Sequence, residues 1–381
     1  MNKINIGLVA GESSGDILGA NLMNSLKKYI PNINFFGISG PCMKKEGMES
    51  WYNIDELSII GLTEIIKKIP RILFIRNNLI KRFIKLNINV FIGIDSPDFN
   101  IFLEKKLKKS GIKVIHYISP SIWAWRKNRI FKIKNSVDQI LSFLPFEKKI
   151  YDKFNIPCKF IGHILADNIP LKPNKKKARK KLNISSKSIC LAILPGSRFN
   201  EIKNLTKTFL YSAKILKNLL PKLKILIPFI NKDCEYIFNK IYYKYTPEIK
   251  IKKYFNQSHT VMIASDVALV ASGTSTLECM LAKCPMVVGY KVNFFTFLIA
   301  KILIKIPWIS LPNIIANKKL VKEFLQKECN PKNLSKELYK LLINKNNNKI
   351  LLKNFYLLHK KIRCNANKKA TRAVIDLIYS K

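Results

Sequence analysis

Short apolar runs alternate with segments of helical periodicity along most of the chain, and this alternation restricts the fold more than any other feature. The runs cover residues 4–10, 33–38, 90–94, 113–118, 139–143 and 159–161 in the first half, and 189–194, 224–229, 267–271 and 286–289 in the second. Strands that are apolar throughout are buried on both faces, and intervening helices place them in parallel sheets. The pattern predicts an α/β protein built from doubly wound parallel sheets.

The chain of 381 residues is too long for one ordinary hydrophobic core. The proline-rich, charged stretch 170–177 is typical of a linker. We therefore expect two Rossmann-like domains, 1–169 and 178–344, with a cleft between them. A terminal helix within 349–381 is expected to pack on the first domain or to swap onto the partner in a homodimer, because apolar residues recur there at helical spacing: Leu351, Leu352, Phe355, Leu358 and Ile362.

The formal net charge of +44 points to an anionic partner, although much of it follows from a composition rich in Ile, Lys and Asn. Nucleic acid, anionic lipid and phosphorylated substrates all fit this charge. No nucleic-acid-binding module is recognisable, so a nucleic-acid-binding protein ranks behind an enzyme. A protein of that class would bind any duplex with a steep dependence on salt.

Metal sites and membrane spans are not expected. The eight cysteines form no CxxC pair, and no two of the four histidines are spaced i, i+4. The most apolar stretch, 294–311, is interrupted by Lys301, Lys305 and Pro307 and falls short of the ~20 apolar residues of a span. The first residues predict a strand and not a signal peptide. We expect neither a metal nor another cofactor.

Carboxylates follow two strands of the predicted first domain at their carboxyl ends, where open parallel sheets bind ligands. Glu12 and Ser14 belong to the turn 11–16, and Asp95 comes directly after the strand 90–94. A carboxylate at a strand tip can act as a general base, worth roughly 100- to 10,000-fold in rate. Carboxylates in the turn suit sugar or amide groups better than phosphate. The structural alternatives are a plain turn at 11–16 and a capping role for Asp95.

A polar helix start follows the apolar strand 267–271. Free backbone N–H groups and the helix dipole make such a start an anion site, and its residues are Ser272, Gly273, Thr274, Ser275 and Thr276. Glu278, one turn further on, can accept hydrogen bonds from sugar hydroxyls. Arg198 follows the strand 189–194 and can bind a diphosphate through two hydrogen bonds. The alternatives are an ordinary capped helix and an Arg198–Glu201 surface pair, worth under about 1 kcal/mol.

Residues 62–86 combine an apolar stripe with interleaved cations. Its candidate membrane-contact residues are Ile65, Ile66, Ile69, Ile72 and Leu73. The pattern fits a core helix with a solvated rim, and it also fits an interfacial segment on anionic lipid. Each cation near such a surface contributes about 1 kcal/mol.

Several motifs, taken together and in order, resemble those of the lipid-A-disaccharide synthase family of bacterial glycosyltransferases. The matching segments are GESSGD, GIDSPDFN, HYISPSIWAWR, FLPFEKKIYDKF, FIGH, LPGSR, ASGTSTLECMLAKCPMVVGYK and SLPNIIA. They extend from the first strand to about Asn317, and the tail 362–365 is also similar. Ser13 stands where the family usually has Ala, and Ile164 where many members have Pro.

The resemblance implies a fold of the GT-B type and transfer of 2,3-diacylglucosamine from UDP-2,3-diacylglucosamine to 2,3-diacylglucosamine 1-phosphate. The β-1,6 product requires inversion at the anomeric carbon, and UDP leaves. It further implies that Asp95 deprotonates the acceptor while Glu12 and Ser14 orient the sugar. Arg198 and the 272–276 helix start would bind the diphosphate, Glu278 the ribose, and Asn313 would lie near the nucleotide.

Acylated substrates imply a cytoplasmic enzyme bound peripherally to the inner face of the inner membrane, with no nucleic acid as partner. A UDP-sugar 2-epimerase of the same architecture is the alternative. That enzyme would act on a soluble sugar and would have no need of the apolar, basic segment 62–86. Incubation with both acylated substrates separates the two classes, because only the transferase needs both to release UDP.

Overall fold

The computed structural model describes residues 3–57, 62–124, 126–293, 297, 298, 303 and 306–380, and the side chains of 62–67 and 345–347 lie outside this description. The chain divides into two compact units. The first unit comprises residues 1–164 together with 362–381, and the second comprises 165–361. Within the described residues, no helix combines the length and the apolar character needed to cross a bilayer.

In the described part of the first unit, a seven-stranded parallel sheet has the order β3-β2-β1-β4-β5-β6-β7. The strands are β1 (Ile4–Ala10), β2 (Ile33–Ser39), β3 (Glu49–Asn53), β4 (Val90–Ile94), β5 (Lys113–Tyr117), β6 (Gln139–Ser142) and β7 (Cys158–Phe160). The helices are α1 (Ser13–Lys27), α2 (Pro41–Lys45), α3 (Leu62–Lys85), α4 (Pro97–Lys109), α5 (Arg129–Lys134), α6 (Glu147–Asp152) and α17 (Ala366–Tyr379). A short 3₁₀ helix covers Ile54–Glu56.

The described part of the second unit contains a six-stranded parallel sheet in the order β10-β9-β8-β11-β12-β13. Its strands are β8 (Cys190–Leu194), β9 (Lys224–Phe229), β10 (Ile251–Phe255), β11 (Val267–Ala271), β12 (Met286–Tyr290) and β13 (Lys322–Leu325). Its helices are α8 (Lys175–Lys181), α9 (Phe199–Leu219), α10 (Lys232–Tyr245), α11 (Ser258–Ala264), α12 (Thr274–Leu281), α14 (Leu311–Ala316), α15 (Pro331–Ile343) and α16 (Lys345–Ile362). Helix α7 (Ile164–Asn168) begins where the first unit passes into the second.

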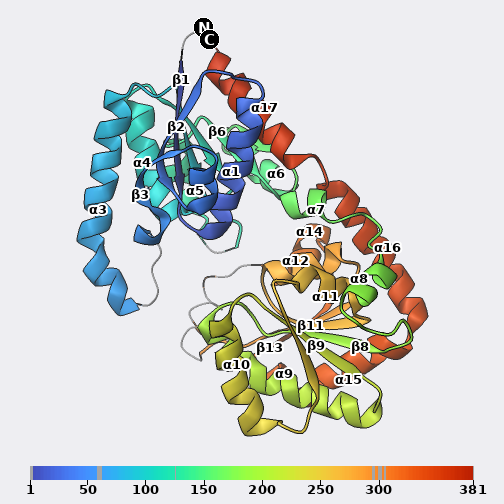
Figure 1. The fold of residues 1–381 in the computed structure, drawn as a ribbon. Coiled ribbons are helices and arrows are strands. Elements are labelled where there is room, and N and C mark those ends of the chain that lie inside the picture. The colour runs from blue at the N-terminus through green and yellow to red at the C-terminus, as the bar shows by residue number, and fades with distance from the viewer. Residues whose placement is uncertain are drawn as a thin grey trace. The chain divides into compact units, whose positions relative to one another are not determined.

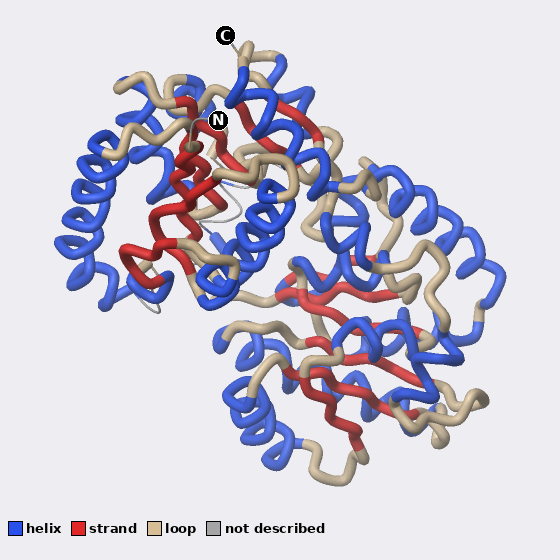
Figure 2. Tube along the Cα trace, turned by 45° about the horizontal axis from the view of Figure 1, so that its top comes forward, coloured by secondary structure: helices blue, strands red, loops and turns tan. Residues whose placement is uncertain are grey.

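The apolar runs form the central strands because both faces of each sheet are covered by helices (Figure 2). Every residue of β4, β8 and β11 is buried. Separate apolar clusters lie on the two faces of the first sheet, and a third cluster fills one face of the second. The predicted α/β class with two doubly wound parallel sheets is confirmed.

The terminal region forms two helices. Helix α16 ends at Ile362, and Asn365 adopts a left-handed conformation with φ 55° directly before α17. Helix α17 lies beside α1 (Figure 1) and buries Ala366, Ala370 and Val374 in the core of the first unit. The end of the chain therefore completes the unit in which the chain begins.

Candidate functional site

The carboxyl ends of β1 and β4 form the first candidate site. The two strands pair in parallel with Ala10 opposite Ile94, so the loops that follow them lie at one edge of the sheet. The strand order reverses between β1 and β4, and ligands of doubly wound sheets bind at such a switch point. Glu12 and Asp95, one from each loop, line a pocket of about 400 Å³ there.

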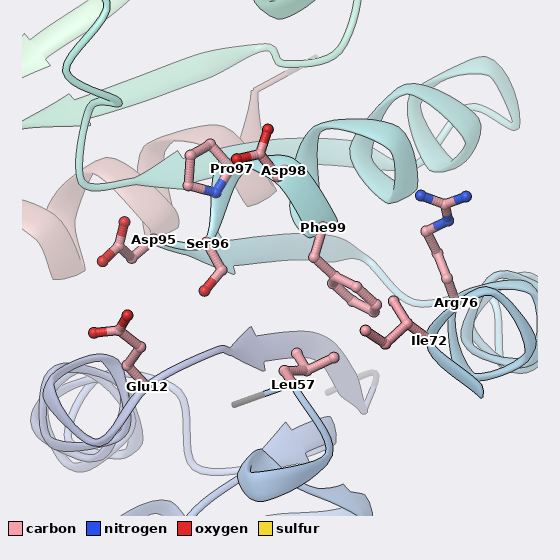
Figure 3. A pocket seen from close by; sticks show the side chains of 9 residues that line it. All are labelled: Glu12, Leu57, Ile72, Arg76, Asp95, Ser96, Pro97, Asp98 and Phe99. Atoms are coloured by element: carbon pink, nitrogen blue, oxygen red, sulfur yellow. The ribbon is translucent and has the colours of Figure 1, made fainter. Parts of the chain in front are cut away.

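The pocket is acidic at one end and basic at the other. Figure 3 shows Glu12 and Asp95 at one end, Arg76 at the opposite end and apolar side chains between them. The described lining residues are Glu12, Leu57, Ile72, Arg76, Asp95, Ser96, Pro97, Asp98 and Phe99. Ser14 is exposed in the first turn of α1 and is not among them.

The backbone at the tip of β4 is strained. Asp95 and Ser96 are consecutive residues in the left-handed region, with φ of 53° and 44°. Strain of this kind costs about 1–3 kcal/mol per residue and concentrates at functional sites. Two hydrogen bonds hold the turn: the Asp95 N–H donates to the Tyr117 carbonyl at 2.9 Å, and Asn100 Nδ2 donates to the Asp95 carbonyl at 2.8 Å. The strained backbone supports a functional role for the Asp95 side chain.

Two other residues of the 11–16 turn are structural. Gly11 is buried against Ser96, and a β-carbon at Gly11 would lie 1.7 Å from Ser96 Oγ. The Asp16 carboxylate accepts hydrogen bonds of 2.8–3.1 Å from the backbone N–H groups of residues 40, 42 and 43, at the start of α2. Gly11 and Asp16 thus build the turn, and Glu12 is left to face the pocket.

A buried polar pair lies behind the strained turn. Glu104 on α4 and His116 on β5 are buried, with Glu104 Oε1 2.6 Å from His116 Nδ1. Gly93 makes room for the pair, because a β-carbon there would lie 2.2 Å from Glu104 Oε1. Burial raises the pKa of Glu104, and the neighbouring His116 opposes this rise. Glu104 lies one helical turn after Asn100, so the pair supports the helix that holds the Asp95 carbonyl.

The aromatic loop after β5 is anchored by a buried carboxyl group. Trp123 Nε1 donates to Glu147 Oε1, and the Leu144 N–H donates to Glu147 Oε2, each at 3.1 Å. Burial raises the pKa of Glu147 to about 7, although these hydrogen bonds oppose the rise. Trp123 also packs edge-on against Phe146. The second tryptophan of the loop, Trp125, lies outside the described residues.

The second candidate site is formed by the carboxyl ends of β8 and β11. These strands pair in parallel with Leu194 opposite Val270, and the strand order again reverses between them. Gly273 precedes α12 with φ 147°, and no atom lies within 4 Å of the place a β-carbon would take. Gly273 and Thr274 are exposed and Ser275 is half-buried, so the start of α12 is accessible to an anion.

Arg198 lies on the neighbouring loop of the same edge. Its side chain is 80% exposed, and Nη1 is 3.8 Å from Glu201 Oε1. Glu201 mainly serves the turn, because its Oε2 accepts a hydrogen bond from the Ser197 N–H at 3.1 Å. The Arg198–Glu201 pair is long and exposed, so it contributes little and leaves the guanidinium able to bind a ligand.

Two predicted anion-binding hydroxyls have partners within the protein. Ser272 Oγ donates to the Ile309 carbonyl at 2.8 Å. Thr276 Oγ1 donates to the Gly273 carbonyl at 2.8 Å and accepts a hydrogen bond from the Leu311 N–H at 3.2 Å. Both side chains therefore connect the start of α12 to the segment that enters α14. The backbone N–H groups of the turn are the better candidates for anion contact.

Asn313 is buried, and its amide is saturated by the protein. Its Nδ2 donates to the Val321 carbonyl at 3.0 Å and to Glu323 Oε1 at 2.8 Å, and its Oδ1 accepts from the N–H groups of Leu320 and Val321 at 2.7 and 2.9 Å. Glu323 also accepts from the N–H and hydroxyl of Ser310. The Asn313 side chain therefore positions the protein around it, and its predicted place near the nucleotide stays a prediction. Sequence reasoning missed Glu323.

Glu278 forms an ion pair that was not expected. Its Oε2 lies 3.0 Å from Nε2 of His259 on α11. The hydrogen bond to Glu278 raises the pKa of His259, and burial opposes this rise to a smaller extent. The contact with His259 fixes the orientation of the Glu278 carboxylate. The two residues lie on successive helices, and no spacing rule in the sequence connects them.

The predicted membrane-contact residues of α3 fall into three groups. Ile65 and Ile66 lie outside the described side chains. Ile69 and Leu73 are exposed, at 44% and 41%. Ile72 is half-buried and lines the pocket, so the structure removes it from the exposed face. Phe74, which sequence reasoning missed, is 55% exposed beside them.

Arg71 and Arg82 are among the cations interleaved in α3 that have partners within the protein. Arg71 Nη2 lies 2.9 Å from Glu56 Oε1, and the Arg82 guanidinium lies 4.3 Å from the ring of Trp51. Neither is free in the way that a solvated cation on an interfacial helix would be. Across the part of the chain that the structure describes, no group of three or more His, Cys, Asp or Glu side chains is arranged to hold a metal ion.

The architecture, with its two doubly wound parallel sheets, is shared with a class of solved two-unit enzymes. The UDP-GlcNAc 2-epimerase of Neisseria meningitidis, solved with UDP-GlcNAc, matches with a TM-score of 0.66 at 15% identity over 98% of this chain and 100% of that one. A glycosyltransferase from Rickettsia africae matches with a TM-score of 0.59 at 13% identity over the full length of both chains. At such identities these likenesses show the fold alone, which is that of GT-B glycosyltransferases and related epimerases.

Sequence comparison decides between the glycosyltransferases and the epimerases. The family model for lipid-A-disaccharide synthetase matches residues 6–374. The lipid-A-disaccharide synthase of Blochmanniella pennsylvanica is 57% identical over 98% of this chain and 96% of its own length, and that of Wigglesworthia glossinidia brevipalpis is 56% identical over 99% and 98%. The chain belongs to the lipid-A-disaccharide synthase family and is a glycosyltransferase. The epimerases are neighbours in fold only.

Proposed function

We propose that the protein transfers 2,3-diacylglucosamine from UDP-2,3-diacylglucosamine to the 6-hydroxyl of 2,3-diacylglucosamine 1-phosphate. The observation that carries this proposal is the pairing of two carboxylates, Glu12 and Asp95, in one pocket at the switch point of the first sheet. The family of the chain supplies the reaction class. A carboxylate that faces a pocket from a strand tip suits removal of a proton from an alcohol.

In this proposal the first unit binds the acceptor. Asp95 takes the proton of the 6-hydroxyl, and Glu12 accepts a hydrogen bond from the sugar. Ser14 is a secondary candidate for orienting the sugar, because it is exposed on α1 and does not line the pocket. The strained backbone at Asp95 and Ser96 fixes the base before substrate arrives, and such preorganisation lowers the barrier.

The second unit binds the donor in the same proposal. The start of α12, with Gly273, Thr274 and Ser275, and the Arg198 guanidinium stabilise the negative charge that develops on the diphosphate. Glu278 binds the ribose hydroxyls, and Ser272, Thr276 and Asn313 position the loop around them. The acceptor oxygen attacks the anomeric carbon as the bond to UDP breaks, which inverts the configuration and forms the β-1,6 link.

The proposal is tested by UDP release from the purified protein with both acylated substrates. Asp95→Asn is expected to lower turnover by roughly 100- to 10,000-fold and to leave UDP affinity unchanged. Asp98→Asn is the matched control, because Asp98 is 77% exposed in the same pocket wall and pairs with Arg126 and Arg129. Turnover that persists in Asp95→Asn would contradict the role of the base. UDP release in the absence of the acceptor would contradict the assignment of the transfer reaction.

We further propose that α3 places the protein on the cytoplasmic face of an anionic membrane, since both substrates carry acyl chains. Ile69, Leu73 and Phe74 form an exposed apolar group on this helix, 41–55% exposed. Replacing all three by Ser is expected to abolish flotation with anionic vesicles and to leave the thermal melting temperature unchanged. The same change at Ile84 and Leu86, near the far end of the helix, is the control. Equal loss in both variants would assign membrane binding to another surface.

A further inference from the structure

The basic end of the first-unit pocket has no role in the reaction described above. Arg76 lies on α3 at the end of the pocket opposite Glu12 and Asp95 (Figure 3). Ile72 lies one helical turn earlier on the same helix, and with Leu57 and Phe99 it gives this part of the pocket an apolar wall. The volume of about 400 Å³ is within the range of small-molecule sites.

Arg76 differs from the other arginines near the pocket. Arg71 pairs with Glu56, and Arg126 and Arg129 both pair with Asp98. Among the described residues no carboxylate lies within ion-pair distance of Arg76, and its guanidinium instead lies 3.7 Å from the ring centroid of Phe102.

The Arg76 side chain is also partly removed from water. Its Nε is buried and has no hydrogen-bond partner in the described structure. Burial lowers the pKa of the guanidinium. A cation that has lost part of its hydration without gaining a counter-ion is destabilising until an anion binds it. Stacking on an aromatic ring leaves the guanidinium edge and its N–H groups available for a bidentate anion.

We infer that Arg76 binds the phosphate of the acceptor and thereby fixes the direction in which the acceptor lies in the pocket. The inference rests on the proposed function. The acceptor 6-hydroxyl lies at Asp95 and the 1-phosphate at Arg76. The exocyclic carbon C6, the ring carbon C5, the ring oxygen and C1 separate the two groups. C2, which carries an acyl chain, is bonded to the carbon that carries the phosphate. Ile72, one turn from Arg76, is the corresponding wall for that chain.

This arrangement gives the enzyme a means of choosing its acceptor. A diacylglucosamine whose C1 carries a free hydroxyl would leave the partly buried Arg76 without a counter-ion. The UDP conjugate carries a second phosphate and a nucleoside that must be accommodated beyond Arg76. The single phosphate of the 1-phosphate acceptor pairs with the Arg76 guanidinium, and no further group has to be accommodated beyond it.

The test compares Arg76→Gln with Arg71→Gln, an arginine of the same helix whose carboxylate partner lies outside the lining residues. Acceptors are 2,3-diacylglucosamine 1-phosphate and the same sugar without phosphate, in detergent free of phospholipid. Arg76→Gln is expected to lower kcat/KM for the phosphorylated acceptor by about 10- to 100-fold, the range for a hydrogen bond to a charged group. The KM for the donor, and the activity with the unphosphorylated acceptor, should stay at the wild-type level. Arg76→Lys should recover part of the loss.

Other outcomes overturn the inference in distinct ways. Equal losses with both acceptors would show that Arg76 only supports the fold. Reduced flotation of Arg76→Gln with anionic vesicles, at unchanged kcat/KM, would assign the cation to a lipid phosphate. If Arg76→Gln fails to fold, the two acceptors are compared with the wild-type protein. Equal kcat/KM for the phosphorylated and the unphosphorylated acceptor would refute phosphate recognition. A wild-type protein that releases no UDP with both substrates would refute the proposed function itself.

Discussion

Gly11→Ala is predicted to inactivate the enzyme by moving the turn that carries Asp95. The new β-carbon would lie 1.7 Å from Ser96 Oγ and 2.6 Å from Ser96 Cβ. Rotation of the serine side chain can remove the first clash but not the second, because Cβ is fixed by the backbone. Ordinary carbon contacts begin near ~3.5 Å, so the backbone of Ser96 must move by about 1 Å.

The displacement acts directly on the proposed base, because Asp95 precedes Ser96. A misplacement of about 1 Å at a reacting group lowers the rate by roughly 100-fold. Overpacking of this kind also lowers the free energy of unfolding by about 1–3 kcal/mol. The assay is UDP release at saturating concentrations of both substrates. UDP affinity measured by calorimetry is the control, since the second unit is unaltered.

Combining Gly11→Ala with Ser96→Gly supplies the decisive comparison. The second change removes both clashing side-chain atoms, and the remaining Ser96 Cα lies 3.9 Å from the place that the new β-carbon would take, an ordinary contact. Glycine also adopts the φ of 44° at this position without strain. The double variant should therefore recover most of the activity that Gly11→Ala loses. Wild-type activity in Gly11→Ala, or no recovery in the double variant, would refute the packing argument.

Three further predictions concern other groups. Burial raises the pKa of Glu147 from 4.5 to about 7, so the contribution of this residue to the free energy of unfolding should fall by about 3 kcal/mol as pH rises from 4.5 to 7. Glu147→Gln should remove this pH dependence of the free energy of unfolding, measured by urea titration. An unchanged pH dependence would contradict the prediction. The pKa of His259 is raised by Glu278, so UDP should bind most tightly below that pKa and more weakly as pH rises through it; calorimetry on His259→Ala should find a flat profile. Asn313→Ala should lower the free energy of unfolding by about 2 kcal/mol, because four hydrogen bonds are lost, two of them buried and two partly buried. A melting temperature equal to the wild type would exclude this role.

The central strands were predictable because burial on both faces requires unbroken apolar runs. β1, β4, β8 and β11 follow the runs read from the sequence. The outer strands β3, β10 and β13 were not predicted. Their residues are mostly half-buried or exposed, as in the polar segment Glu49–Asn53, so no apolar run marks them. An edge strand is defined by the neighbour that it pairs with, and that neighbour is not visible in a local pattern.

The candidate sites were predictable as loops, while the direction of each side chain was not. Strand ends located Asp95, Glu12 and Arg198. The hydroxyl of Ser272 and the amide of Asn313 were of the right type for ligand binding, yet both are used by the protein because α14 and β13 pack against the same turn. Arg76 became a candidate only once the fold placed it at the far end of the Asp95 pocket.

The return of the chain to its first unit has a consequence for biosynthesis. Ala370 and Val374 of α17 fill the core beside α1, but they are made roughly 200 residues after the rest of that unit. At about 5–20 residues per second a ribosome needs on the order of 10–40 s to cover this distance. During that interval the apolar groove on the nascent first unit is open to water. The first unit can therefore complete its core only after the whole second unit has been synthesised.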